Sequence, residues 1–420
     1  MISLLMFEFF ALLNITYVFV LGNVFPGFSS SLFSLTTMVV AFFFCICNLS
    51  TLQLMLKNKY IFMMSVALLI YPVAVSVLNY GVFFEAFDSR SNAERLLGIV
   101  LFISSSIYGM KVSVSRAKRL IICSVVVTIF GIILSLLLPQ IFLFALEAVN
   151  AKSVLSGRGF GFYLQPNSVA MALCFLFGSY VVVCRDHKVH KVAVAVLLSL
   201  LLTASRAGLL CFLFFFLLVY LRGERFLTVP GFIKTIPKLA VFASGGVLLL
   251  ILAISIYSSY APSNSEFSGV DRLNSMFNLE FDQTNKHKGS GAGDRINAII
   301  EFSEAIYERP VGYGLGVVAD YKEKGRFTFS SHNQYLLVGF EAGVLGMFLY
   351  IILIYRLKNI CITRIGRIYT SSFAYLVLLY GLFINNILSL RVSLFCIGLI
   401  FGVYYQRKLR QTCKLQKVPV

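Results

Sequence analysis

Long apolar runs separated by short polar or basic stretches make up most of the chain. The period-two alternation of apolar and polar residues that marks the strands of an outer-membrane barrel is missing from them. The pattern instead predicts an all-α, polytopic helical membrane protein with about twelve transmembrane helices. The predicted spans cover residues 3–21, 31–50, 60–79, 96–110, 120–138, 163–184, 192–204, 207–221, 239–257, 334–355, 369–385 and 391–405.

Composition agrees with this fold class. Hydrophobic residues make up 59% of the 420 residues and charged residues only 13%, and the mean hydropathy is +0.86. A soluble domain is nearer a quarter charged. No small-residue cleavage site follows the first apolar run, so we expect it to be a retained span rather than a signal peptide.

The net charge of +18 is explained by where the basic residues lie. They gather after even-numbered spans, which places both termini in the cytoplasm by the positive-inside rule. The charge is therefore a signal of topology, and nucleic acid is not expected as a partner. The predicted organisation is spans one to nine in 1–257, a large periplasmic loop in 258–333, and spans ten to twelve with a basic cytoplasmic tail in 334–420.

Motifs for metals, nucleotides and disulfides are weak. The nine cysteines lie in predicted spans or on the cytoplasmic side, and no zinc-type spacing occurs. The glycine patterns at 289–294 and 312–316 do not complete a dinucleotide fingerprint and are read as turns. Glu280 and Asp282 could hold a divalent cation or could simply be solvated. We expect no metal and no cofactor.

The stretch LLTASRAGLL (201–210) places Arg206 between two apolar runs. Basic segments precede and follow this stretch, so the chain between them must cross the membrane an even number of times. This favours a hairpin of two short helices whose tip, with Ser205 and Arg206, lies below the outer surface of the membrane. At 1.5 Å per residue such helices reach about 20–22 Å, short of the hydrocarbon core of about 30 Å. The alternative is one tilted span with Arg206 near its middle.

Residues 295–308 of the large loop are predicted to form an amphipathic helix at the membrane surface. Asp294 is the expected N-cap and Pro310 the stop. The expected apolar face holds Ile296, Ile299, Ile300, Ala305 and Ile306, and the acidic face holds Glu301, Glu304 and Glu308.

Two titratable residues flank the start of the tenth span. His332 is either a general base at the depth of the lipid headgroups or an interfacial histidine satisfied by water. Glu341 lies two or more turns into the helix, where a carboxyl group is either functional or paired with an arginine. Gly339 and Gly343 have the spacing of a close helix contact.

Four arginines are expected on the outward side: Arg158, Arg206, Arg295 and Arg391. Each alone could be an anchor, but together they could bind a phosphate-rich group, because arginine stays charged and offers a planar fork of donors. Arg206 would also begin a half-helix, whose free N–H groups favour an anion. A bound lipid diphosphate would offset the free-energy cost of placing the Arg206 charge below the membrane surface.

Three segments resemble the O-antigen polymerase/ligase superfamily of bacterial envelope proteins. They are RGFGFYLQPNSVAMAL (158–173), LLTASRAGLL (201–210) and the block from GDRINAIIEF to SHNQYLLVGFEAGVLG (293–346). The resemblance spans roughly residues 155–355. One departure is visible, since members often carry a tryptophan in the helix after the arginine and this chain has none.

The resemblance implies transfer of a glycan from an undecaprenyl-diphosphate carrier to an acceptor hydroxyl at the periplasmic face of the bacterial inner membrane, without metal or nucleotide. Arg206 and Arg295 would hold the diphosphate, supported by Arg158, and His332 would deprotonate or orient the acceptor hydroxyl. The other expected substrate-binding residues are Asn167, Ser205, Asn333, Glu341 and Arg391.

Several functions remain open from the sequence. A polymerase, which we favour, adds the growing chain to another lipid-linked repeat unit, whereas a ligase transfers the finished chain to lipid A-core. A lipid-linked oligosaccharide flippase would bind the same diphosphate, but the long outer loop argues against it. A scaffold protein would have no reason to gather arginines. The expected partners are the lipid-linked glycan, the bilayer and a chain-length regulator.

Overall fold

The computed structural model describes residues 2–20, 30–56, 61–83, 88–143, 146, 158–184, 189–220, 292–318, 321, 327, 333–358, 360–361, 364–384, 387–388 and 390–415. Most of these residues are helical and no strand lies among them, which confirms the all-α class. The α-helices are α1 (Ile2–Ile15), α2 (Ser30–Ile46), α3 (Leu49–Leu56), α4 (Ile61–Phe83), α5 (Ser89–Lys111), α6 (Val114–Leu137), α8 (Pro166–Cys184), α9 (His190–Thr203), α10 (Arg206–Tyr220), α14 (Ala292–Glu308), α16 (Gln334–Leu357), α17 (Arg364–Phe383) and α18 (Arg391–Leu415). Two short 3₁₀ turns are η2 (Pro139–Phe142) and η4 (Gly161–Tyr163).

Four helices in the described part of the chain are long and apolar enough to cross a membrane, or five if α2 and α3 form one bent span. The expected count of twelve spans therefore stays a prediction, and the ninth predicted span, 239–257, lies outside the described residues. The second predicted span, 31–50, is not one straight helix, because α2 and α3 meet at 81°. The fourth is longer than expected, since α5 begins at Ser89 rather than at residue 96.

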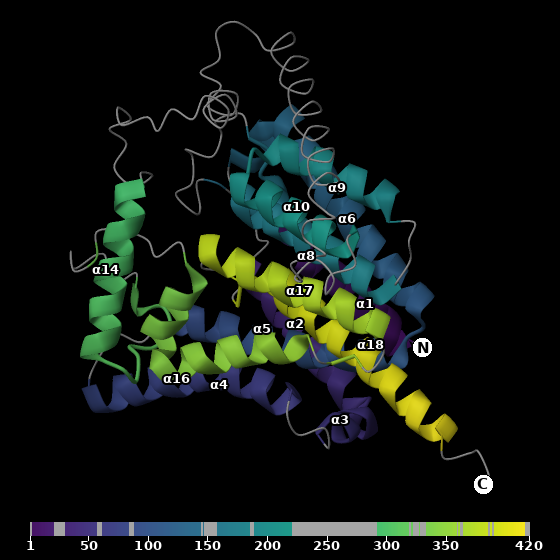
Figure 1. Ribbon diagram of the computed structural model, residues 1–420, viewed down its shortest axis with the longest axis horizontal. Coiled ribbons are helices and arrows are strands. Elements are labelled where there is room, and N and C mark those ends of the chain that lie inside the picture. Colours follow the sequence, from purple (N-terminus) through teal and green to yellow (C-terminus); the bar gives the residue numbers. More distant parts are fainter. Residues whose placement is uncertain are drawn as a thin grey trace, which may run out of the picture.

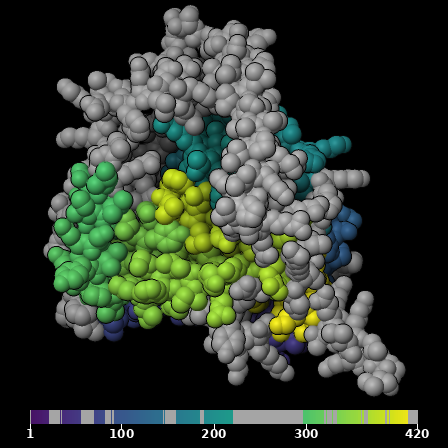
Figure 2. All heavy atoms as spheres, in the orientation of Figure 1, coloured from purple at the N-terminus to yellow at the C-terminus, as the bar shows by residue number. Residues whose placement is uncertain are grey.

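α8 is the centre of the bundle. It packs against α6, α9, α10, α17 and α18, and nearly all of its side chains are buried. Figure 1 shows α6, α8, α9 and α10 grouped at the upper right, with α4 and α16 running together along the lower edge. α14 stands at the left and packs on α16, and Figure 2 shows their side chains as one adjoining face.

α5 and α18 pack backbone against backbone. A Cβ atom at Gly402 would collide with the backbone oxygen of Ser106, and one at Gly109 would lie 2.6 Å from the backbone oxygen of Leu399. Only glycine lets the two backbones approach this closely, which is the usual means of packing helices in lipid.

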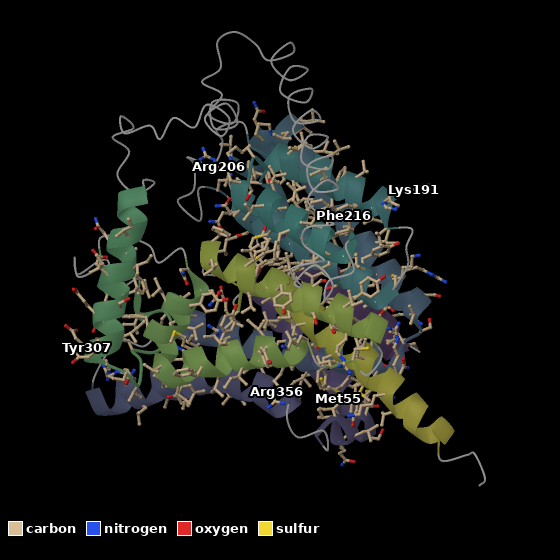
Figure 3. All side chains as sticks on the ribbon, viewed as in Figure 1. Met55, Lys191, Arg206, Phe216, Tyr307 and Arg356 are labelled. Carbon is tan, nitrogen blue, oxygen red and sulfur yellow. The ribbon has the colours of Figure 1, made fainter. Side chains whose placement is uncertain are left out.

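Hydrogen bonds sort the helix ends into two sets. At one end, called here the turn end, Tyr163 donates to the carbonyl of Ile15 and Tyr335 donates to the carbonyl of Leu378 at 2.9 Å. The α9–α10 connection lies at this end. At the opposite end, called here the basic end, Tyr404 donates to the carbonyl of Val182 at 3.0 Å. In Figure 3 Arg206 and Lys191 mark the two opposite ends of the α9–α10 pair.

Candidate functional site

The chain reverses between α9 and α10 within two residues. Ala204 adopts a left-handed conformation (φ 47°, ψ 36°) and ends α9. Ser205 then caps α10, because its hydroxyl oxygen accepts the backbone N–H of Gly208 at 3.3 Å. Arg206 is the first residue of α10. The two-helix hairpin is thus confirmed over a single tilted span, with helices of 14 and 15 residues.

Arg158 holds this turn in place. Its Nε donates to the carbonyl of Thr203 and its Nη2 to the carbonyl of Ala204, both at 3.2 Å. The next residue, Gly159, donates its N–H to the carbonyl of Leu202 at 2.9 Å. The last carbonyls of a helix have no partner within it, so these donors complete the end of α9.

The N-termini of α8 and α10 are joined at the same place. The Ser205 hydroxyl donates to Oδ1 of Asn167 at 3.0 Å, and Asn167 lies in the first turn of α8. Ser205 is only 1% exposed, whereas Asn167 and Arg206 are exposed. The N-termini of two helices and an exposed guanidinium therefore lie together, which is the chemistry that binds a phosphate or another anion.

The start of α16 belongs to the same end of the bundle. A Cβ atom at Gly208 in the first turn of α10 would lie 3.2 Å from the hydroxyl of Tyr380, and one at Gly381 would lie 3.1 Å from the ring of Tyr335. The first turns of α10 and α16 thus both pack against the last turns of α17.

Asn333 is the N-cap of α16. Its Oδ1 accepts the N–H groups of Tyr335 at 2.9 Å and Leu336 at 3.3 Å. The following residue, Gln334, is buried and accepts the N–H of Ile387 at 2.7 Å. The side-chain oxygen of Asn333 is thus engaged in the cap, and its binding of substrate stays a prediction. His332 lies outside the described residues, as do Glu280 and Asp282.

Arg295 lies in the first turns of α14, and its side chain is outside the described part. Figure 3 labels Tyr307 at the lower end of α14, so the first turn lies at the upper end, on the side of the view where Arg206 is labelled. The helix begins at Ala292, two residues before the predicted N-cap Asp294, and it ends at Glu308 before Pro310, as predicted.

The predicted apolar face of α14 is wrong in part. Ala305 is buried with Phe302 against α16, while Ile300 is 50% exposed. Positions 300 and 305 lie about 140° apart on a helix with 3.6 residues per turn, so they cannot share a face. The structure divides α14 into a face buried on α16, an acidic face, and an exposed apolar face formed by Ile296, Ile299, Ile300 and Tyr307.

Glu341 and Arg391 have protein partners of their own. The Glu341 carboxylate accepts from Nη2 of Arg95 at 3.3 Å, so the arginine-paired alternative is the one observed. Nη1 of Arg391 donates to Oδ1 of Asn14 at 2.6 Å, and its guanidinium lies 4.9 Å from the ring centre of Phe19. Substrate contact by either residue stays a prediction.

Sequence reasoning missed Arg95. The predicted span began at residue 96, which left Arg95 in a loop, whereas it lies well inside α5 and is buried. The available signal was the polar but helix-compatible stretch SRSNAE before the apolar run. Gly343 was also misread, because it has φ 67° and breaks α16 instead of packing two helices. Gly339 does make a close contact, with Ile306 of α14.

Residues 192–351 match the family model described as O-Antigen ligase. The match confirms the resemblance to the O-antigen polymerase/ligase superfamily. The O-antigen ligase match contains α9 from Val192 onward, all of α10 and α14, and α16 as far as Ile351, whereas Arg158 and Asn167 precede it. No curated protein and no solved structure matches the chain. Among the described residues, no three His, Cys, Asp or Glu side chains are placed to hold a metal ion.

Proposed function

We propose that the chain is an O-antigen polymerase that joins undecaprenyl-diphosphate-linked repeat units at the periplasmic face of the inner membrane. One observation carries the proposal: Arg206 is exposed at the first position of α10, and the Ser205–Asn167 hydrogen bond joins it to the N-terminus of α8. This arrangement suits the leaving diphosphate of a lipid carrier. The family match, which includes the same hairpin, supports glycan transfer by a polymerase or a ligase.

The proposed reaction uses these residues in separate roles. The acceptor hydroxyl oxygen attacks the anomeric carbon while the bond from that carbon to the carrier diphosphate breaks. His332 takes the hydroxyl proton, and Arg206 with Arg295 stabilises the negative charge that develops on the diphosphate. Arg158 supports Arg206 by holding the α9–α10 turn.

The same proposal sets the orientation in the membrane. The turn end would face the periplasm, and the basic end with both termini would face the cytoplasm. Lys191, Arg356 and Arg407 at or near the ends of α9, α16 and α18 fit this orientation by the positive-inside rule. A chain-length regulator is proposed as a partner on the periplasmic side.

A ligase is the second candidate, because the matched family is described by that activity. The two activities share the donor and differ in the acceptor. A polymerase extends a chain that is still linked to its carrier, whereas a ligase transfers the chain to lipid A-core.

The test is deletion of the gene in its host followed by analysis of lipopolysaccharide on a gel. The wild-type gene should restore the ladder, and Arg206→Ala and His332→Ala should not, because loss of a preorganised charge or of the general base lowers the rate about a hundredfold or more. Lys191→Ala is the matched control, an exposed basic residue at the other end of the same hairpin. Immunoblotting should show equal amounts of each protein.

The deletion phenotype separates the candidates. Core carrying a single repeat unit identifies a polymerase. Bare core with polymer left on its carrier identifies a ligase, and bare core with unpolymerised units retained at the cytoplasmic face identifies a flippase. A full ladder from Arg206→Ala would contradict the assigned role of this arginine.

A further inference from the structure

Arg95 and Glu341 form an ion pair in the interior, between α5 and α16. Arg95 is 5% and Glu341 7% exposed, and Nη2 lies 3.3 Å from Oε2. The second terminal nitrogen of Arg95, Nη1, is buried and has no hydrogen-bond partner. A buried charge requires compensation, so the position of Arg95 depends on Glu341.

Glu341 lies two residues before the break in α16. There the segment after α14 supplies the backbone partners that the helix lacks. The N–H groups of Tyr313 and Gly314 donate to the carbonyls of Phe340 and Glu341 at 2.8 and 2.9 Å, and the N–H of Val344 donates to the carbonyl of Pro310 at 2.9 Å. Irregular backbone at membrane depth is tolerated only when such groups are satisfied within the protein.

The same segment is fixed to α4. The side-chain amide of Asn79 donates to the carbonyl of Gly312 at 3.0 Å and accepts from Arg309 at 2.7 Å. The hydroxyl of Ser76 accepts the N–H of Leu315 at 2.6 Å. Together with the ion pair, these contacts tie α14 and the first half of α16 to the α4–α5 pair.

The distance along α16 shows how the pair could affect the site. Eight residues separate Glu341 from Asn333, about 12 Å at 1.5 Å per residue. The pair is too far from the start of α16 to touch a substrate bound there. Any effect on the reaction must therefore pass through the direction of the half-helix 334–342 and of α14.

We infer that Arg95 is a positioning residue: its buried pair with Glu341 sets the direction of α14 and of the first half of α16 relative to α10. The inference rests on the proposed function, because α14 carries Arg295 and α16 follows His332. It assigns Glu341 to the placement of the site rather than to binding of the substrate. Misplacement of reacting groups by about 1 Å can lower a rate about a hundredfold.

The test uses the full-length protein in proteoliposomes with a lipid-linked oligosaccharide donor. Arg95→Met and Glu341→Leu each leave one buried charge unpaired and should accumulate poorly. The double variant removes both charges and should accumulate like wild type. Its kcat should fall about tenfold to a hundredfold, with the donor KM within about twofold of wild type, and Arg95→Lys should retain a larger part of the rate.

A second readout does not depend on activity. Spin labels at Tyr307→Cys on α14 and Leu210→Cys on α10, in a cysteine-depleted background, report the distance between the two helices; both positions are exposed. The double variant should shift or broaden the distance distribution. An unchanged distribution, or wild-type kcat in an abundant double variant, would overturn the inference. Absence of transfer by the wild-type protein, or wild-type transfer by Arg206→Ala, would instead refute the proposed function, and the distance measurement would still decide the inference.

Discussion

Arg116 and Glu8 form a two-point ion pair that joins α6 to α1 at the basic end. Nη2 of Arg116 lies 2.8 Å from Oε2 of Glu8, and Nε binds Oε1. The hydroxyl of Tyr108 on α5 adds a third donor at 2.6 Å. The acid in the first apolar helix therefore connects three helices.

Removing this carboxylate should loosen α1. Glu8→Gln should lower the free energy of unfolding by about 1–2 kcal/mol. This is less than for a fully buried ion pair, because both side chains are partly exposed to solvent. The measurement is the thermal midpoint of the purified protein in detergent. Glu304→Gln, at an exposed acid on α14, is the control. Equal midpoints for the two variants would contradict the prediction.

The contact between α5 and α18 should not tolerate a methyl group at Gly402. Gly402→Ala would press its Cβ against the backbone oxygen of Ser106, which cannot move without shifting α5. We expect a loss of about 3 kcal/mol or more, at the upper end of the range for overpacking. Gly81→Ala is the matched control, since no atom lies within 4 Å of its added Cβ. Limited proteolysis in membranes should separate the two, and similar resistance would disprove the close packing.

Arg158 should affect stability, whereas Arg206 should affect binding of the donor. Arg158→Met removes two donors from the end of α9 and should lower the free energy of unfolding by about 1–3 kcal/mol. Arg206→Ala removes an exposed side chain and should leave the thermal midpoint within about 1 °C of wild type. Donor binding measured alongside should weaken more in Arg206→Ala. The reverse order of effects would show that Arg158 is the main contact of the diphosphate.

The exposed apolar face of α14 should contact lipid. A fluorophore at Ile300→Cys should be quenched by lipids that carry a spin label near the headgroup, because an amphipathic helix buries its apolar face at the boundary of headgroups and acyl chains. A fluorophore at Glu308→Cys, on the acidic face and about 80° around the helix from Ile300, should be quenched less. Equal quenching at the two positions would place α14 away from the bilayer.

The parts of this fold that sequence predicts are those set by local pattern. The hairpin at Arg206 is predicted because the basic segments before and after it require an even number of membrane crossings. The end of α14 is predicted by Pro310. The bend between α2 and α3 falls at Cys47 and Asn48, and one asparagine within a long apolar run does not by itself predict a turn of 81°. The residues of the candidate site can be selected from the sequence. Their hydrogen-bond partners cannot, because these depend on how the helices pack.

Long-range contacts explain most of what was missed. Arg95 and Glu341 are 246 residues apart, and no local pattern indicates that they meet. The faces of α14 were misassigned because a list of apolar residues does not say which of them a neighbouring helix will cover. Phe302 and Ala305 face α16, which leaves three isoleucines outside.

The hydrogen bond between Arg391 and Asn14 joins residues 377 positions apart, at the end of α1 and the start of α18. During synthesis the first helix therefore enters the membrane long before its partner has been made. Until α18 inserts, Asn14 lacks this guanidinium, and Ser106 and Gly109 of α5 lack the residues of α18 that pack against them. A chain cut short before α18 would leave polar groups exposed to lipid, where membrane proteases and chaperones can recognise them. Insertion of α18 thus completes the packing around α1 and α5.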